Sequence, residues 1–423
     1  MKKIGKILLS LSMITLLFGC KKKTYKDNTT KKNDKTNVVT NNTTTKTNNT
    51  TKKNDSKNYH FVFANYDGTV LYEGDMTKGW TVANSLIPKP SRANEGNYFY
   101  NFTGWSSTVN SVTDRDVTYT AQYEKLTIPY EVSGNKIYFG YYPQTLEDDD
   151  SKIASLNDTA KLPSTNNNWI SYNYYNDNLQ SDYMWYIDLD TNSDGRFDYR
   201  GVYFTNYRPY NITKVAGESL SNIDEYHYTT ENVYWFKYEK IEWDVLSNTD
   251  GSRFIVANLA LDAQEFCPGH DSIPMAHNGS TDYYNAYKYS EIKKWLNNEF
   301  YNTAFNDTEK KIIALSNVKT RRFVKEGSSD SYCDNNVFLL SDTEVEEYLS
   351  TKTCKTTDYA RIQGIASDAN GYANWGLRTP STGSPSYSNT AIQTQYVNTE
   401  GNIYFAYTED SEIGIRPCLI LKS

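Results

Sequence analysis

Tyr234-Trp-Phe-Lys-Tyr-Glu-Lys-Ile-Glu-Trp-Asp-Val-Leu246 predicts a long β-strand, because aromatic and branched side chains are frequent along it. The turn signal Asn248-Thr-Asp-Gly251 follows, and Arg253-Phe-Ile-Val-Ala-Asn258 predicts the next strand. Lys136-Ile-Tyr-Phe-Gly140 has the same character. We expect these three segments to form a meander at the centre of the fold.

Three short helices are expected after this meander. Ser290 is placed to cap a helix whose apolar residues recur at helical spacing: Ile292, Trp295, Leu296, Phe300. Asn306 with Glu309, and Ser341 with Glu344, have the spacing of capping boxes. Strands are expected again at 374–378, 403–407 and 413–420. Residues 126–423 therefore predict an α+β domain rather than a repeated strand–helix–strand unit.

Residues 59–125 are expected to form a smaller unit. His60-Phe-Val-Phe63 and Thr69-Val-Leu-Tyr72 flank the hairpin signal Asn65-Tyr-Asp-Gly68. Two further strand-like segments follow, Phe102-Thr-Gly-Trp105 and Val117-Thr-Tyr-Thr-Ala-Gln-Tyr123. This order of motifs resembles the Listeria–Bacteroides repeat, the B-repeat of internalins. The resemblance implies a small β-grasp-like surface module with Trp105 in its core.

The larger domain also contains segments that resemble a known family. They occur in the same order in an uncharacterised bacterial domain family: Ile137-Tyr-Phe-Gly-Tyr-Tyr-Pro-Gln-Thr145, Ser290-Glu-Ile-Lys-Lys-Trp-Leu-Asn297, Asn374-Trp-Gly-Leu-Arg-Thr-Pro380, Gly414-Ile-Arg-Pro417. The last two are similar to the end of formylglycine-generating enzymes and related C-type-lectin-like domains. The resemblance implies a C-type-lectin-like fold in which Arg378 and Arg416 are buried or line a groove. The catalytic cysteines of those enzymes have no matching motif here, so their activity is not carried over.

The first 58 residues predict export and anchoring. Lysines precede an apolar run from Ile7 to Phe18, which ends at Leu17-Phe-Gly-Cys20 and resembles a lipobox. We expect cleavage before Cys20 and lipid attachment to its thiol. The alternative is an ordinary secretory signal with a chance cysteine. Residues 21–58, rich in Asn, Thr and Lys, are too polar to fold and predict a tether about 35 Å long.

These features place the protein on the cell surface, on the outer face of the cytoplasmic membrane, or on the outer membrane if the source is diderm. The charge of the folded part excludes one class of partner. Fourteen lysines and three aspartates give residues 1–58 a charge of +11, so −18 remains for the rest of a chain whose total is −7. Nucleic acid is therefore not an expected partner, because phosphate binding needs a basic face.

The segment Asp188-Leu-Asp-Thr-Asn-Ser-Asp-Gly-Arg-Phe-Asp198 has the spacing of a calcium loop. From Asp190, oxygen-bearing side chains fall at positions 1, 3, 5 and 9, which are Asp190, Asn192, Asp194 and Asp198. Gly201 stands where a bidentate carboxylate is usual, and Asp188 is the candidate substitute. A structural Ca²⁺ site and a plain turn are both open.

The remaining cysteines are Cys267, Cys333, Cys354 and Cys418. Outside the cytoplasm they are candidates for two disulfides, and the sequence leaves the pairing open. Cys267 and His270, with His277 nearby, form the best candidate for a metal or catalytic cluster, but a loop without such a role is the favoured interpretation.

Sequence motifs assign no catalytic residue. The leading hypothesis is a surface-anchored, non-enzymatic binding or adhesion protein of the cell envelope, whose large domain takes a glycan or a host or cell-surface protein. The alternative is a cell-surface hydrolase or modifying enzyme on a lectin-like scaffold. The 38 tyrosines suit sugar stacking, but they also suit strands, so composition does not decide between these functions.

Overall fold

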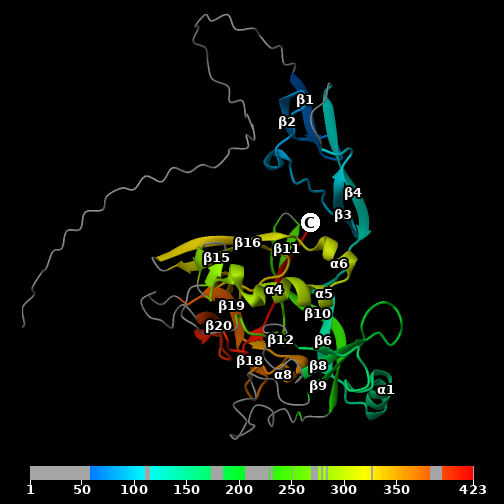
Figure 1. The fold of residues 1–423 in the computed structure, drawn as a ribbon, viewed down its shortest axis with the longest axis vertical. Helices are drawn as coiled ribbons and strands as arrows, with labels where there is room; N and C mark the ends of the chain where they lie inside the picture. The colour runs from blue at the N-terminus through cyan, green and yellow to red at the C-terminus, as the bar shows by residue number, and fades with distance from the viewer. Residues whose placement is uncertain are drawn as a thin grey trace, which may run out of the picture.

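The computed structural model shows an α+β protein in which strands predominate and helices are short (Figure 1). It describes residues 58–109, 115–172, 184–204, 228, 232–249, 251–267, 275–277, 280–282, 284–324, 327–381 and 393–422. The predicted signal peptide, Cys20 and the tether lie outside these residues, apart from Asn58, which begins the first strand.

The N-terminal unit is a four-stranded sheet in the order β2-β1-β4-β3. Its strands are β1 (Asn58–Ala64), β2 (Val70–Thr77), β3 (Tyr98–Trp105) and β4 (Val117–Thr127). β1 pairs in parallel with β4, and antiparallel with β2 through the predicted turn, where Gly68 has a φ of 86°. Trp105 is half-buried and its ring centroid lies 4.7 Å from that of Phe63, so it packs against the small core.

The next sheet has eight strands and is organised by β10 (Val233–Thr249). Phe236 pairs with both Leu146 and Arg200, and Trp243 pairs with both Ile137 and Ala257. β6 therefore pairs with one edge of β10. β9 and β11 pair with successive parts of the other edge. The predicted meander is confirmed. The other members of the sheet are β5 (Glu131–Ser133), β6 (Lys136–Leu146), β7 (Ile170–Ser171), β8 (Met184–Leu189), β9 (Tyr199–Phe204), β11 (Ser252–Ala257) and β23 (Cys418–Leu421).

A five-stranded sheet lies beside it in the order β12-β22-β19-β20-β21. Its strands are β12 (Asp262–Ala263), β19 (Trp375–Pro380), β20 (Gln393–Val397), β21 (Ile403–Tyr407) and β22 (Gly414–Ile415). Three hairpins complete the strands: β13 (Met275–His277) with β14 (Ser280–Asp282), β15 (Ser316–Val324) with β16 (Gly327–Asn335), and β17 (Cys354–Lys355) with β18 (Tyr372–Ala373).

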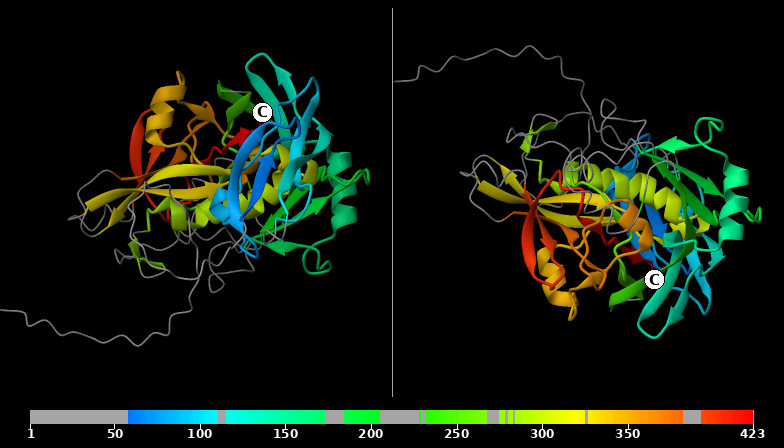
Figure 2. Two further views of the ribbon diagram at one scale, coloured as in Figure 1. Left: turned by 90° about the horizontal axis from the view of Figure 1, so that it is seen from above. Right: turned by 90° about the horizontal axis from the view of Figure 1, so that it is seen from below.

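The expected helix caps are present. Ser290 Oγ accepts the backbone N–H of Lys293 at 3.3 Å, and both predicted capping boxes form. The helices are α1 (Asp150–Ala160), α4 (Glu291–Trp295), α5 (Tyr301–Ala304), α6 (Asp307–Ile312), α7 (Asp342–Tyr348) and α8 (Asp358–Ile362), with a π-helical turn, η4 (Leu296–Phe300), and two 3₁₀ turns, η1 (Asn84–Leu86) and η3 (Tyr287–Tyr289). Figures 1 and 2 show α1 and the β15–β16 hairpin at opposite ends of the molecule.

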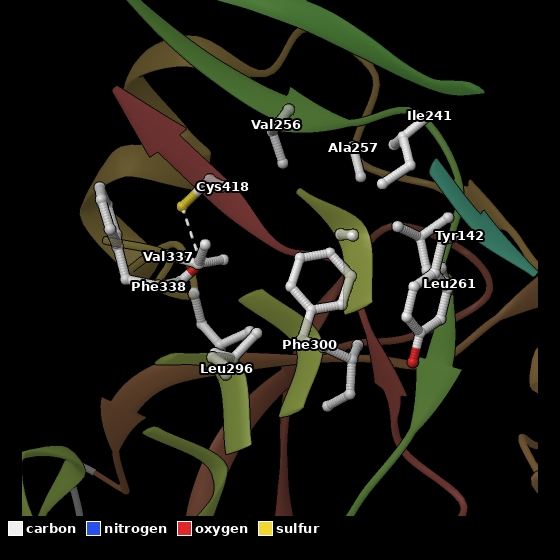
Figure 3. Close-up of a cluster of buried hydrophobic side chains, with 14 of the residues drawn as sticks. Tyr142, Ile241, Val256, Ala257, Leu261, Leu296, Phe300, Val337, Phe338 and Cys418 are labelled. Atoms are coloured by element: carbon white, nitrogen blue, oxygen red, sulfur yellow. Dashed lines mark hydrogen bonds between the residues drawn. The ribbon is translucent and has the colours of Figure 1, made fainter. Parts of the chain in front are cut away.

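One large core joins these sheets and helices. Figure 3 shows Phe300 at its centre, between Val256 and Ala257 of β11 on one side and Leu296 on the other. The ring of Tyr142 lies 5.0 Å from that of Phe300, and its hydroxyl donates to Asp262 at 2.6 Å. All four residues predicted on the apolar face of the Ser290 helix are buried. Burial of apolar area is the main stabilising contribution of such a core.

The small sheet passes directly into the larger part of the chain. β4 ends at Thr127, the N–H of Ile128 donates to Asn97 O at 2.9 Å, and β5 begins at Glu131. Lys311 of α6 lies 2.9 Å from the Glu124 carboxylate, and Phe99 is buried in the large core. The smaller unit is therefore seated on α6 rather than joined by a loose linker.

Gly140 is a position where the core admits no side chain. Its φ is +70°, and an added Cβ would lie 2.5 Å from the ring of Phe305 and 2.9 Å from Ala304 O. We expect Gly140→Ala to lower the free energy of unfolding by about 3 kcal/mol or more, since strain and overpacking add.

The matched control is Gly134→Ala. Gly134 has a similar φ of +59° but nothing within 4 Å of an added Cβ, so strain alone should cost about 1 kcal/mol. Urea unfolding of both variants measures the difference. Equal losses would contradict the packing argument.

Candidate functional site

Arg378 occupies β19, a strand whose residues are all buried. Its guanidinium forms a bidentate ion pair with Glu344 of α7, with N–O distances of 2.5 and 2.6 Å. Its Nε donates to Lys319 O at 3.0 Å, and its Nη1 also donates to Leu339 O at 2.6 Å. The side chain is 4% exposed, as predicted for a buried arginine that bonds a carboxylate and strand carbonyls.

Glu344 has a second role in the first turn of α7. Its Oε2 accepts the backbone N–H of Ser341 at 2.9 Å, while Ser341 Oγ accepts the N–H of Glu344 at 3.2 Å. Burial alone would lower the pKa of Arg378, but the hydrogen bonds to Glu344 and its negative charge raise that pKa. The arginine stays charged, and one carboxylate fixes both the start of α7 and the strand behind it.

Arg416, the second predicted arginine, is also buried. Its Nε donates to Ala257 O at 2.8 Å, Nη2 lies 3.5 Å from Asp244 Oδ2, and the guanidinium sits 4.9 Å from the ring centroid of Trp375. It joins β11 to the second sheet. Arg416 therefore supports the scaffold, whereas Arg378 reaches the surface of a cavity.

A pocket of about 630 Å³ opens beside the Arg378–Glu344 pair. Its walls come from the β10–β11 turn, β15, α7, β19 and β23, and Figure 1 shows β15 close to β19. Nine of its 21 lining residues carry hydroxyl groups, eight of them Ser or Thr: Ser247, Thr249, Ser252, Ser316, Thr320, Ser341, Thr343, Thr379 and Tyr348. Phe254, Phe338 and Tyr348 add an aromatic wall, with the Phe254 and Phe338 rings stacked 5.8 Å apart. We call this cavity the hydroxyl pocket.

A second cavity, of about 580 Å³, lies on the other side of α7. It has seven lining residues: Asp342, Thr343, Glu346, Glu347, Gln395, Ile403, Phe405. Asp342, Thr343 and Glu347 line both cavities. We call this second cavity the β21 pocket. The first turns of α7 are thus a ridge between two adjoining hollows.

The charges on this ridge are negative. In the hydroxyl pocket, Lys319 pairs with Asp330 at 2.8 Å and Arg378 pairs with Glu344, and exposed Arg321 adds a third positive charge. In the part of the chain that the structure describes, Asp342 accepts two neutral donors, the N–H of Thr343 at 2.8 Å and the hydroxyl of Thr379 at 3.0 Å. With Glu347 it brings the lining to four carboxylates against three basic side chains, which disfavours a polyanionic ligand.

The predicted calcium loop is held by its own backbone. The carboxylate of Asp190 accepts N–H groups from Ser193, Asp194 and Gly195, at 2.6, 3.3 and 2.9 Å. The Asp198 carboxylate accepts from both the backbone and the hydroxyl of Thr191. Such bonds within a loop are those of an Asx-type turn.

Two more of the predicted calcium ligands form hydrogen bonds to backbone N–H groups within the loop. Asn192 Oδ1 accepts the Asp194 N–H at 2.8 Å, and Asp194 Oδ1 accepts the Arg196 N–H at 2.8 Å. Asp188, the candidate substitute ligand, lies on β8 and forms a bidentate pair with buried Arg200, at 2.7 and 2.6 Å. Among the described residues, His, Cys, Asp and Glu side chains form no group of three placed to hold a metal ion. Calcium binding stays a prediction.

The loop also has a packing role that its sequence did not reveal. Arg196 Nη2 donates to Glu309 at 2.8 Å, and Glu309 is the buried capping-box residue of α6. The guanidinium of Arg196 lies 4.6 Å from the ring centroid of Tyr141. The turn therefore directs an arginine onto α6.

The four C-terminal cysteines are buried thiols rather than disulfide halves in the described part of the chain: Cys267, Cys333, Cys354, Cys418. Cys354 Sγ donates to Asn258 O at 3.4 Å, and Cys418 Sγ donates to Phe338 O at 3.1 Å (Figure 3). Burial raises the pKa of Cys267 to about 12, so its thiol stays protonated at neutral pH. His270 lies outside the described residues.

Comparison with known proteins gives one match. Residues 271–423 match a domain of unknown function, DUF6273. Arg378, Glu344 and most of the residues that line both pockets fall inside this matched region. No curated protein and no solved structure matches the chain. None of the helices in the described ranges is long and apolar enough to span a membrane.

Asp190→Ala tests the role of the aspartate-rich loop. Three backbone N–H groups lose their acceptor, so we expect the free energy of unfolding to fall by about 1–2 kcal/mol in EDTA. Asp194→Ala, which removes the acceptor of a single N–H, should cost less.

Unfolding measured with and without excess Ca²⁺ separates the two interpretations of this loop. Calcium that stabilises the native chain but not Asp190→Ala would establish an ion site, because binding to the native state adds to its stability. Equal losses in both conditions would identify a turn.

Proposed function

We propose that this chain is a lipid-anchored cell-surface protein that binds glycan, without catalysis, in the hydroxyl pocket. The observation that carries the proposal is the lining of that pocket. Its volume lies within the range of about 300–1,000 Å³ that ligand sites occupy, and hydroxyl-bearing and charged side chains make up much of its wall. An apolar ligand would leave the remaining hydrogen-bonding capacity of these groups unused, whereas a polyhydroxylated ligand can fill it.

The hydroxyl groups of the wall retain capacity to bind. Thr379 donates to Asp342, and Ser316 donates to Ala314 O, yet each oxygen keeps a lone pair that can accept from a sugar hydroxyl. Carboxylates such as Glu347 accept such donors as well. The aromatic wall offers ring faces to the C–H groups of a pyranose. Donors, acceptors and an apolar face thus stand together in one cavity.

A finer description of the fold supports a surface role. We assign residues 59–125 to a β-grasp-like module similar to the internalin B-repeat, and residues 126–423 to a C-type-lectin-like domain. Both resemblances rest on sequence motifs, and lectin-like folds host many functions. The glycan proposal therefore depends on the pocket and not on the fold.

Anchoring through Cys20 has its own test. The two chains of a diacylglycerol hold a protein stably on a bilayer, so Cys20→Ser should move the protein from the membrane fraction to the soluble fraction or the medium. Detergent phase partitioning with metabolic lipid labelling measures this. A labelled, membrane-bound Cys20→Ser protein would rule out the assignment.

Glycan binding is tested by screening the purified protein against neutral and amino-sugar oligosaccharides, with affinities from calorimetry. Glu347→Ala should weaken binding by about tenfold, equivalent to about 1.4 kcal/mol, since it removes one exposed carboxylate acceptor. Glu73→Ala, at an exposed residue of β2 in the N-terminal sheet, is the matched control and should bind normally.

Three results would count against this assignment. If no glycan in the panel binds, the proposal fails. If Glu347→Ala binds normally, the pocket is wrongly assigned. If incubation with the protein shortens the oligosaccharides, the alternative function of a surface hydrolase is favoured.

A further inference from the structure

The two pockets beside α7 share part of their walls, and this bears on the size of the ligand. Three residues of the ridge, Asp342, Thr343 and Glu347, line both of them. A molecule that fills the hydroxyl pocket and extends past these side chains enters the β21 pocket directly. The combined site is therefore longer than a single sugar ring.

The chemistry of the β21 pocket differs from that of its neighbour. Its outer wall is Phe405, whose side chain is 48% exposed, next to Ile403 on the same face of β21. Its inner wall includes buried Gln395, whose Nε2 donates to Pro380 O at 3.3 Å. An exposed ring opposite carboxylates presents one apolar and one polar wall, as a sugar ring requires.

The strand that carries Phe405 is firmly placed. β21 pairs with β20 over five residues, from Gln393–Tyr407 to Val397–Ile403, and it is the edge strand of the sheet in the part of the chain that the structure describes. Ala406, between Phe405 and Tyr407, is buried and fixes the face on which these rings appear. The platform is therefore preformed, which limits the entropy lost on binding.

The negative charge of the β21 pocket limits which sugars can bind there. The β21 pocket is lined by three carboxylates, Asp342, Glu346 and Glu347, of which Glu346 is paired with Lys352 at 2.5 Å. Uronic acids and sulfated sugars would meet like charge in the β21 pocket. Neutral sugars and amino sugars meet none.

We infer that the two pockets are subsites of one groove that takes a neutral or amino-sugar oligosaccharide across α7, with Phe405 as the stacking platform of the second subsite. This inference rests on the proposed glycan binding. It adds that the ligand is longer than one sugar, that it is not anionic, and that it contacts the β21 pocket as well as the hydroxyl pocket.

The experiment compares β-linked oligomers of glucose and of N-acetylglucosamine, from one to six units, by calorimetry on the full chain. With the native protein, affinity should rise by about ten- to hundredfold once an oligomer is long enough to reach both subsites, and then level off. Phe405→Ala should abolish this gain and leave the affinity for the shortest binding oligomer unchanged. Phe405→Tyr, which keeps a ring, should restore the gain.

Arg321→Ala serves as the opposite variant, because exposed Arg321 lines the hydroxyl pocket alone. It should weaken short and long oligomers alike. Thermal melts of all three variants confirm folding, which the exposure of both side chains favours.

The failure of this inference is distinct from that of the proposed function. If oligomers bind but affinity is independent of length, or if Phe405→Ala keeps the full gain, the groove is overturned while glycan binding stands. If neither series binds, both proposals fall. Uncharged peptides that bind in a Phe405-dependent manner, with no oligosaccharide binding, would make β21 a peptide-docking edge and overturn the inference.

Discussion

The bidentate bond between Arg378 and Glu344 is the interaction on which the candidate site depends. Through it, β19, the first turn of α7 and the carbonyl of Lys319 in β15 are fixed relative to one another. These three elements supply much of the wall of the hydroxyl pocket, and α7 is also the ridge shared with the β21 pocket. Removing one partner of a buried pair leaves an uncompensated charge, which typically costs about 3–5 kcal/mol. The walls of both pockets therefore depend on an ion pair whose loss would strongly destabilise the fold.

A second capping-box glutamate also forms an ion pair with an arginine. Glu309 closes the capping box of α6, as Glu344 closes that of α7, and each of these glutamates also binds an arginine brought from elsewhere in the chain. Arg196 comes from the aspartate-rich turn, and α6 in turn carries the contact from Lys311 to Glu124 in the N-terminal sheet. α6 and α7 are too short to be stable as isolated helices. Each is stabilised at its N-terminus by a capping box and on its side by an arginine.

Patterns of residues close in the sequence predicted the helices and strands well, but they did not predict the hydroxyl pocket. The capping boxes and the buried face of the Ser290 helix depend on residues three or four apart, and the meander depends on runs of strand-forming residues, so the sequence contains each signal in one place. Arg378 was expected in a groove only through a family resemblance. The hydroxyl pocket could not be foreseen, because its serines and threonines come from segments between 247 and 379 and have no spacing rule. The aspartate spacing from 190 to 198 was ambiguous for a related reason: side-chain oxygens that suit an ion also suit backbone N–H groups. Phe405 lay in a predicted strand, but nothing in its neighbours marked it as exposed.

The pairing within the N-terminal sheet has a mechanical consequence. The chain enters this sheet at the start of β1 and leaves it at the end of β4, and these two strands run parallel from Phe61–Val117 to Ala64–Thr120. A pull between the N-terminal segment and the large domain acts along both strands in opposite directions. Their interstrand hydrogen bonds are then loaded together in shear, instead of being opened one at a time from an end. The N-terminal sheet is thus oriented to resist mechanical unfolding whenever the large domain is bound to a ligand and the N-terminal end of the chain is attached to a surface.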